Sequence, residues 1–458
     1  MTALFVFVLF IDKNIYGQIP SVNSNQSKQA VLPENLSDTI SPKVYEKIRR
    51  RIDRRRKYLK NQGAFLLQTN PPPPVRFNFP LRHSAGVSNF NLDMITFFVD
   101  HDTGNGVQDF NCGGRTKDIH TGTDITLWPF WWSSMDLNHG EVVAAADGRI
   151  FEKVDGNFDR RCDETHPDAN YIILEHDDGS FTLYYHLKKD SLTTKKEGER
   201  VVQGEFLGNV GSSGESTGPH LHFEVWDANK ISIDPFLGNC NSNQTPLWAI
   251  QPPYRDAKIN DLRIHSAPPE ILPLCSLKDI PHIKNVFRPG ETFFPVAYFR
   301  DQLKDETAEF EIRQPDKTVF TNWTVKIEDS DLAYFTHDKS FVLPANAPLG
   351  TWTFRAKYLN KTYERQFTVV GNQVAPLQIG GRVTNSAGLP VSKADVLITD
   401  ANGVIQTTKT NRKGIFKFAQ VPFGEEYTLY ATANDLRFLA QTRTLTANVS
   451  DFDLRAEP

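Results

Sequence analysis

The sequence predicts a mainly β protein, in which an antiparallel-sheet domain is followed by two small β-sandwiches and preceded by a short basic helix. Two observations support this prediction. Short β-like runs rich in Gly and His fill residues 76 to about 250, and alternating runs separated by turn residues follow from about residue 257. The length of 458 residues fits about three domains, at roughly 100–200 residues each.

The composition is that of an ordinary globular protein. Hydrophobic residues make up 39% and charged residues 23% of the chain, which excludes a wholly disordered, collagen-like or multi-span membrane protein. Lys and Arg number 51 against 55 Asp and Glu, a net charge of −4, so no broad basic surface is available for nucleic acid. We therefore expect no nucleic-acid partner.

The first seventeen residues have the features of an export signal. Residues 3–11 (ALFVFVLFI) are apolar, a length typical of the core of a signal peptide and too short to cross a bilayer, which needs about 20 helical residues. We predict a signal peptide over residues 1–17 and an exported protein, located in the periplasm, at the cell surface or outside the cell. The alternative is a buried N-terminal strand. No later segment is apolar enough to span a membrane, so we expect no transmembrane segment.

Export would permit disulfide bonds. Pairing of Cys112 with Cys162 and of Cys240 with Cys275 is sensible, but four cysteines allow three connectivities. The sequence does not choose among them.

Residues 18–75 are predicted to be a linker that contains a basic helix. Residues 43–60 hold ten basic and two acidic residues, and Val44, Ile48 and Ile52 recur at helical spacing. The resulting charge of +8 (10 − 2) leaves −12 (−4 − 8) for the rest of the chain. We favour a solvated pro-segment or spacer over an electrostatic tether to an anionic envelope polymer. Whether this stretch inhibits the protein until it is removed stays open.

The remaining chain divides into three predicted domains, at residues 76–255, 256–371 and 372–458. Four prolines at 71–74 form a stiff break before the first of them. The segment TWTFRAKY in the second domain alternates as a strand does, and glycine-containing turns recur at regular intervals in the third. Both later domains therefore have the pattern of small antiparallel sandwiches.

Histidine clustering marks the first domain as the place where chemistry occurs. Seven of the twelve histidines lie between His120 and His222, where an even spread would place about three. His120 and Asp124 in HTGTD stand four residues apart around Gly122, and both side chains suit Zn²⁺. The clustering and the donor types indicate a metal or acid–base site.

Two predicted strands carry three of these histidines. In GPHLHFEV, His220 and His222 alternate with apolar residues, so both imidazoles share the face opposite the core. In FTLYYHL, the same alternation places His186 on one face with Tyr184.

Taken in order, these elements resemble the M23 family of zinc metallopeptidases, the lysostaphin/LytM-like endopeptidases. The family pattern of H-x-G-x-D, Y-x-H-L and G-x-S-T-G-P-H-L-H-F-E is matched by HTGTD at 120–124, YYHL at 184–187 and GESTGPHLHFE at 214–224. The resemblance covers about residues 110–226 and implies that the catalytic domain is a LytM-like antiparallel β-sheet.

The resemblance implies one zinc ion per chain, bound by His120, Asp124 and His222, with a coordination position left open for water. His186 and His220 would then be the catalytic histidines, and the division of roles between them stays open. The substrate implied is the peptide part of peptidoglycan, cut at its cross-links. Degenerate members of the family typically lack some of these five residues, whereas this sequence has them all.

Three tryptophans follow closely after Asp124. Trp128, Trp131 and Trp132 lie in an insertion relative to the family pattern. They could form an apolar wall of the substrate cleft, or they could pack on the sheet as a hydrophobic plug. We treat them as candidate substrate-binding residues and leave both interpretations open.

The two later domains also resemble known modules. Residues 256–371 are similar to an immunoglobulin-like sandwich and residues 372–458 to a carboxypeptidase-regulatory-like sandwich. They would position the enzyme or bind an envelope or surface polymer, or serve only as spacers.

The leading hypothesis is a secreted zinc metalloendopeptidase of the cell wall. Three other functions stay open. The first is a non-catalytic LytM-like protein that binds the cell wall or activates a hydrolase. The second is a surface adhesin that acts through the sandwiches, and the third is a general protease of glycine-rich proteins.

Overall fold

The computed structural model describes residues 40, 42–61, 74–160, 168–241, 246–271, 278–327, 332–371, 375–433 and 436–457. The chain is mainly β, with several antiparallel sheets and a helix near the N-terminus, so the predicted fold class is confirmed. The predicted signal peptide at 1–17 lies outside the described residues. Within the described part of the chain, no helix is both long enough and apolar enough to cross a bilayer.

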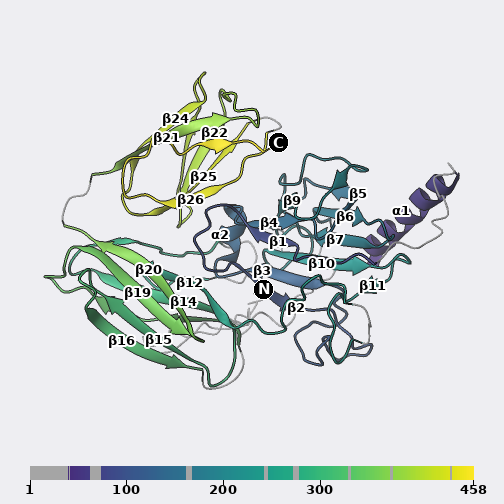
Figure 1. The fold of residues 1–458 in the computed structure, drawn as a ribbon, viewed down its shortest axis with the longest axis horizontal. Helices are drawn as coiled ribbons and strands as arrows, with labels where there is room; N and C mark the ends of the chain where they lie inside the picture. The colour runs from purple at the N-terminus through teal and green to yellow at the C-terminus, as the bar shows by residue number, and fades with distance from the viewer. Residues whose placement is uncertain are drawn as a thin grey trace, which may run out of the picture.

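The first body of the molecule is built on an eight-stranded antiparallel sheet (Figure 1). Its strands run in the order β2-β3-β10-β7-β6-β5-β8, and β11 pairs with β10. Their bounds are Asp93–Phe97 (β2), Thr123–Leu127 (β3), His220–Trp226 (β10), Phe181–Tyr185 (β7), Tyr171–Glu175 (β6), Gly148–Val154 (β5), Arg200–Val201 (β8) and Ser232–Ile233 (β11). A three-stranded sheet consists of β1 (Leu81–His83), β4 (Gly140–Val143) and β9 (Phe206–Asn209).

The two sheets share one hydrophobic core because alternate residues of a strand point to the same face. Ile125 of β3 and Leu221 and Phe223 of β10 are fully buried in this core. Asp124 precedes Ile125 in β3, and His222 lies between Leu221 and Phe223 in β10. These two residues are direct partners in the β3–β10 register and lie on the opposite face. The candidate site is therefore on the face of the large sheet that turns away from the main core.

Helix α1 (Pro42–Asn61) confirms the predicted helix, and it packs on this second face. Ile48 and Ile52 are fully buried in a cluster with Phe181 of the sheet, which stabilises the docked helix by roughly 1.5–3 kcal/mol for each side chain. Arg51 donates to the buried carboxylate of Glu152 at 2.8 Å. The apolar stripe of this helix has a buried partner surface, so the helix is docked rather than solvated, and a role as pro-segment or spacer stays a prediction.

Two β-sandwiches follow the first body. The sheets of the first are β12-β14-β17, with β18 beside β14, and β13-β20-β19-β15-β16. Their bounds are Lys258–His265 (β12), Val286–Phe287 (β13), Thr292–Gln302 (β14), Thr307–Arg313 (β15), Val319–Lys326 (β16), Leu332–Asp338 (β17), Phe341–Val342 (β18), Gly350–Tyr358 (β19) and Lys361–Val369 (β20).

The sheets of the second sandwich are β24-β21-β27 and β23-β22-β25-β26. Their bounds are Leu377–Thr384 (β21), Asp395–Asp400 (β22), Ile405–Lys409 (β23), Ile415–Val421 (β24), Glu426–Thr432 (β25), Gln441–Thr444 (β26) and Leu454–Arg455 (β27). Because the main core and the two sandwich cores each draw on one stretch of chain, we propose 76–255, 256–371 and 372–458 as the domain division.

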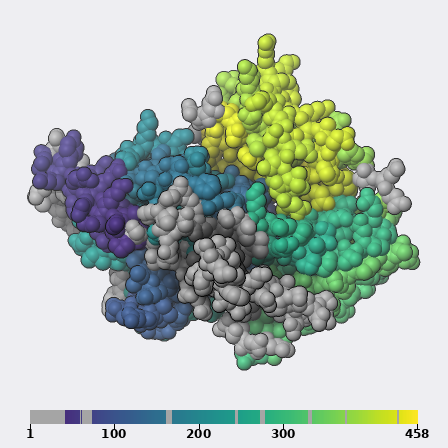
Figure 2. Space-filling view, turned by 180° about the vertical axis from the view of Figure 1, so that it is seen from behind, coloured from purple at the N-terminus to yellow at the C-terminus, as the bar shows by residue number. Residues whose placement is uncertain are grey.

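The three bodies contact one another, and Figure 2 shows the yellow atoms of the last sandwich beside the green atoms of the first. The indole of Trp128, which follows β3, donates to the carbonyl of Phe299 in β14 at 3.1 Å. Arg263 of β12 is buried and donates to Glu426 of β25 at 2.9 Å and to Ser88 of the first body at 3.0 Å. These bonds fix the sandwiches against the sheet that carries the candidate site.

A disulfide links Cys112 to Cys240, with Cα atoms 5.1 Å apart. The pairing of neighbouring cysteines that seemed sensible from the sequence is therefore wrong. The rings of Phe110 and Phe236 stack with centroids 5.0 Å apart, and the amide of Cys240 donates to the carbonyl of Phe110. These contacts bring the two loops together although 128 residues separate the cysteines.

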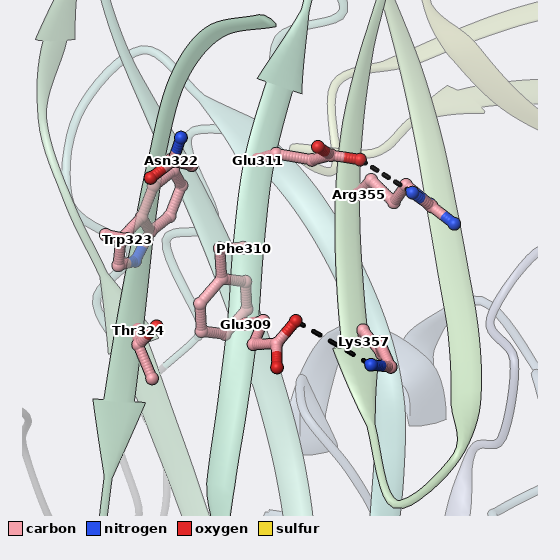
Figure 3. Close-up of a pocket in the computed structure, with 8 residues that line it drawn as sticks. All are labelled: Glu309, Phe310, Glu311, Asn322, Trp323, Thr324, Arg355 and Lys357. Atoms are coloured by element: carbon pink, nitrogen blue, oxygen red, sulfur yellow. Dashed lines mark hydrogen bonds and ion pairs between the residues drawn. The ribbon is translucent and has the colours of Figure 1, made fainter.

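An open pocket lies on the first sandwich, where β15, β16 and β19 run side by side (Figure 3). Arg355 donates to Glu311 at 2.7 Å, and the ammonium of Lys357 lies 3.8 Å from the carboxylate of Glu309. Each carboxylate of the pocket is thus neutralised by a cation on the adjacent strand.

The buried ion pair between Arg263 and Glu426 should dominate the contact between the two sandwiches. We expect Glu426→Gln to lower the free energy of unfolding by about 2–3 kcal/mol, since a buried hydrogen bond to a charged partner is lost. Glu309→Gln, which breaks an exposed pair, should change it by less than about 1 kcal/mol. Urea denaturation followed by tryptophan fluorescence measures both.

The ion pair between Arg263 and Glu426 should also make the difference in free energy of unfolding between wild type and Glu426→Gln depend on pH. Burial would raise the pKa of Glu426, but the charges of Arg263 and Arg365 and the hydrogen bonds from Ser88 and Arg263 together outweigh burial and lower it. A carboxyl whose pKa is lowered on folding stabilises the protein above its unfolded pKa of about 4.3, and this contribution is lost as the pH falls through the folded value. The gap between wild type and Glu426→Gln should therefore be full at neutral pH and close in acid; a gap that stays constant down to pH 3 would contradict the assignment.

Candidate metal centre

His120, Asp124 and His222 meet at one point of the sheet. His120 lies in the turn before β3, Asp124 is the second residue of β3, and His222 faces it from β10. Nε2 of His120 lies 3.1 Å and Nδ1 of His222 lies 2.8 Å from Oδ1 of Asp124. The three side chains are at most 2% exposed, and their potential ligand atoms all lie within 4.8 Å of one another.

Hydrogen bonds on the far side of each ring select which nitrogen faces this point. The Nδ1–H of His120 donates to the carbonyl of Phe98 at 2.7 Å, which leaves Nε2 as the atom that faces Asp124. His222 is turned the other way, because its Nε2–H donates to Glu224 at 2.8 Å and Nδ1 faces Asp124. Each imidazole therefore presents one nitrogen to the cluster.

These residues fit a divalent metal ion. Nε2 of His120 is buried and makes no hydrogen bond among the described residues, so a ligand there would satisfy an otherwise unpaired polar atom. Two imidazole nitrogens and one carboxylate oxygen are donors that Zn²⁺ prefers, and three protein ligands leave a position open. The carboxylate–histidine contact behind His222 is the arrangement that commonly orients histidine ligands of metals.

Lys117 contacts the cluster and is a residue that sequence reasoning missed. Its ammonium lies 3.1 Å from Oδ2 of Asp124 and 4.2 Å from the ring centre of Phe97. The contact fixes the second oxygen of Asp124 and turns the first toward the histidines. No spacing rule singles out this lysine, and its place in the loop before His120 is the sole sequence signal.

The charges of the cluster are strongly coupled. Burial would raise the pKa of Asp124, but the charges of His120, Lys117 and His220 hold it well below its usual value. Burial opposes a charge on His222, yet its hydrogen bonds to Asp124 and Glu224 outweigh burial and raise its pKa to about 9. The cluster thus combines the ionised carboxylate of Asp124 with the His222 imidazole, whose surroundings favour a positive charge.

His186 and His220 lie beside this cluster. The Nδ1–H of His186 donates to the carbonyl of Ser213 at 2.7 Å, and that of His220 donates to the carbonyl of Gly218 at 2.8 Å. The two rings have centroids 4.7 Å apart, and Nε2 of His220 lies 3.6 Å from Oδ1 of Asp124. Both rings therefore carry Nδ1–H and turn Nε2 toward the same space.

The expected strand face of His186 is wrong. Tyr184 belongs to the main core and its hydroxyl accepts from the amide of Ala145, whereas His186 lies at the candidate site. Strand β7 ends at Tyr185, and His186 adopts the left-handed conformation with φ of 62°. This residue breaks the alternation and turns the imidazole onto the site face, at a backbone cost of order 1–3 kcal/mol.

The three tryptophans lie near the site but are almost entirely buried. Trp128 and Trp131 pack in a cluster with Tyr298 and Tyr334 of the first sandwich, and the guanidinium of Arg160 lies 4.6 Å from the ring centre of Trp132. A Cβ on Gly218 would lie 3.3 Å from the Trp131 ring, so this tryptophan backs the turn before His220. This placement matches the plug interpretation, and direct contact of the three with substrate stays a prediction.

The sequence matches known families in two segments. The description "Peptidase family M23" matches residues 120–235, and "Carboxypeptidase regulatory-like domain" matches residues 378–455. Peptidoglycan DD-endopeptidase ShyC of Vibrio cholerae is 32% identical over 114 residues, which are 24% of this chain and 21% of that protein. DD-carboxypeptidase/endopeptidase Mpg of Neisseria meningitidis is 49% identical over 85 residues, or 18% and 16% of the two chains.

Among solved structures, the catalytic domain of lysostaphin from Staphylococcus simulans covers 34% of this chain and 96% of its own, at 26% identity. The TM-score of this match is 0.21.

The match to peptidase family M23 supports a domain of the metallopeptidase class, and the histidine-rich cluster could hold its metal ion. Residues 120–235 of the chain form a peptidase family M23 domain.

The absence of a side chain at Gly122 is needed for the cluster to form. A Cβ at this position would lie 2.6 Å from Nε2 of His222 and 2.9 Å from the carbonyl oxygen of Phe223. We expect Gly122→Ala to displace the His222 ring and weaken zinc binding by about tenfold or more. The matched control is Gly114→Ala, whose added methyl group would have its nearest neighbour 4.0 Å away. Competition with a chromophoric chelator measures both affinities, and equal values would refute the requirement for Gly122.

Proposed function

We propose that the protein is an exported zinc metalloendopeptidase that hydrolyses peptide cross-links of bacterial peptidoglycan. The observation that carries this proposal is the buried cluster of His120, Asp124 and His222 with two more histidines turned toward it. A non-catalytic binding protein has no evident need for all five side chains.

The substrate class is inferred from the matched proteins. The curated relatives ShyC and Mpg are described as a peptidoglycan DD-endopeptidase and a DD-carboxypeptidase/endopeptidase. Because the matched segments are 21% and 16% of those proteins, the activity and substrate of the whole chain are part of the proposal. Peptidoglycan lies outside the cytoplasm, which agrees with an export signal at 1–17. The surface-polymer partner of the sandwiches stays a prediction.

His120 through Nε2, His222 through Nδ1 and Asp124 through Oδ1 would hold one zinc ion. When bound, zinc supplies Lewis acidity, which lowers the pKa of a coordinated water and polarises the carbonyl of the scissile peptide. His186 and His220 present Nε2 in the same space and keep Nδ1–H on backbone carbonyls. Imidazole is the side chain that most often serves as a general acid or base in enzymes, so these two would take a proton from the water and give one to the leaving amine.

Alanine variants separate binding from catalysis. We expect His186→Ala and His220→Ala to keep zinc and lose activity by about 10²–10⁴-fold, because a general acid–base group is removed. His120→Ala and His222→Ala should lose both zinc and activity. His282→Ala, on a partly exposed side chain of the first sandwich, is the control and should match wild type. Mass spectrometry of peptides released from purified peptidoglycan, with zinc measured per chain, reads out both properties.

Two results would contradict the proposal in different ways. A zinc-loaded wild type that binds peptidoglycan without releasing peptides would be a non-catalytic cell-wall protein. A wild type that cuts glycine-rich proteins and leaves peptidoglycan intact would be a general protease.

A further inference from the structure

Helix α1 reaches the candidate metal centre through one side chain. The hydroxyl of Tyr45 donates a hydrogen bond to Oε1 of Glu224 and lies 2.6 Å from Oγ1 of Thr121. Glu224 is the carboxylate behind His222, and Thr121 is the neighbour of His120. A helix outside the matched M23 segment therefore contacts the residues that surround two of the three proposed ligands.

Glu224 is the centre of this network. Its side chain is buried within the sheet face, and its Oε1 accepts from Nε2–H of His222 at 2.8 Å and from Thr121 at 2.9 Å, besides Tyr45. Its other oxygen, Oε2, accepts from the indole of Trp226 at 2.7 Å. Four hydrogen bonds fix the position and orientation of this buried carboxylate. The carboxylate in turn fixes the orientation of the His222 imidazole, which donates to it.

Tyr45 is itself held in place by the docked helix. Its ring lies 5.7 Å from the ring of Trp226, and the guanidinium of Arg49 lies 5.1 Å from the ring centre of Trp226. One turn further along, Ile48 is fully buried in the cluster beneath the helix. The contacts that dock α1 on the sheet thus also place the Tyr45 hydroxyl beside Glu224.

We propose that Tyr45 is a positioning residue of the metal centre, which acts through Glu224 to turn Nδ1 of His222 toward the metal. The helix that carries it is then a part of the centre, and its docking and zinc binding strengthen each other. This inference rests on the proposed function, since it needs His222 to be a zinc ligand.

The physical basis is the geometry of the donor shell. Without the Tyr45 hydroxyl, Oε1 of Glu224 loses one of its three donors and the carboxylate gains freedom to rotate within the sheet face. Partners of this kind behind a histidine ligand typically change metal affinity by about 10–100-fold when mutated. Linkage requires reciprocity, so a helix that raises zinc affinity must itself be stabilised by zinc to the same extent.

The test compares two identical substitutions in the same helix. We expect Tyr45→Phe to weaken zinc binding by about 10-fold or more, as for other partners behind a metal ligand. Tyr58→Phe, at an exposed position of α1, should leave it unchanged within error. Affinity is measured on the full chain by competition with a chromophoric chelator, with zinc as the probe. The melting temperature of the zinc-free proteins is recorded alongside, because a merely structural tyrosine would lower that temperature without changing zinc affinity.

A double-mutant cycle tests the route through Glu224. Glu224→Gln should weaken zinc binding, and adding Tyr45→Phe to it should cost much less than Tyr45→Phe costs in wild type, since both changes act on one network. Fully additive losses would overturn the proposed route.

Hydrogen exchange of the α1 amides tests reciprocity. Zinc should slow exchange in wild type and in Tyr58→Phe, and it should do so far less in Tyr45→Phe. Equal protection by zinc in all three proteins would refute the coupling.

Failure of the inference and failure of the proposed function are distinguishable. If wild type binds zinc and cuts peptidoglycan while Tyr45→Phe binds zinc equally well, the inference fails and the function stands. If Tyr45→Phe binds zinc equally well and cuts faster, α1 is a cover over the substrate path, and the inference fails. If wild type binds no zinc, the proposed function fails as well.

Discussion

The pairing of β3 with β10 is the constraint on which the rest of the site depends. Its register sets Asp124 directly opposite His222, and the alternation of both strands sends their neighbours Ile125, Leu221 and Phe223 into the main core. A shift of one residue would bury the ionised carboxylate in that core and expose three large apolar side chains. The hydrophobic core therefore fixes the geometry of the polar cluster.

The cluster is polar and almost fully buried, so each of its groups needs a partner. Backbone carbonyls accept from Nδ1–H of His120, His186 and His220, and Glu224 accepts from the opposite nitrogen of His222. These acceptors decide which nitrogen of each ring faces the cluster. The proposed ligand nitrogens, Nε2 of His120 and Nδ1 of His222, are the ones that these acceptors leave facing Asp124.

Sequence reasoning succeeded where the structure depends on short-range periodicity. The spacing of Ile48 and Ile52 predicted α1, and the alternation in GPHLHFEV predicted the shared face of His220 and His222. It failed for His186, because a left-handed residue without glycine gives no signal that the alternation ends. It also missed Lys117, the Cys112–Cys240 bond and the contact between Tyr45 and Glu224, since these depend on loops and on elements brought together by tertiary packing.

Strand β3 is held at both ends by parts of the chain that the M23 match does not include. Just before it, Thr121 lies against Tyr45 of α1, and just after it, the indole of Trp128 donates to Phe299 of the first sandwich. The strand has only five residues, so both anchors lie within a few residues of Asp124. A helix and a sandwich with no proposed chemistry of their own can therefore set the position of a proposed metal ligand, which is a physical reason for them to be packed against this domain.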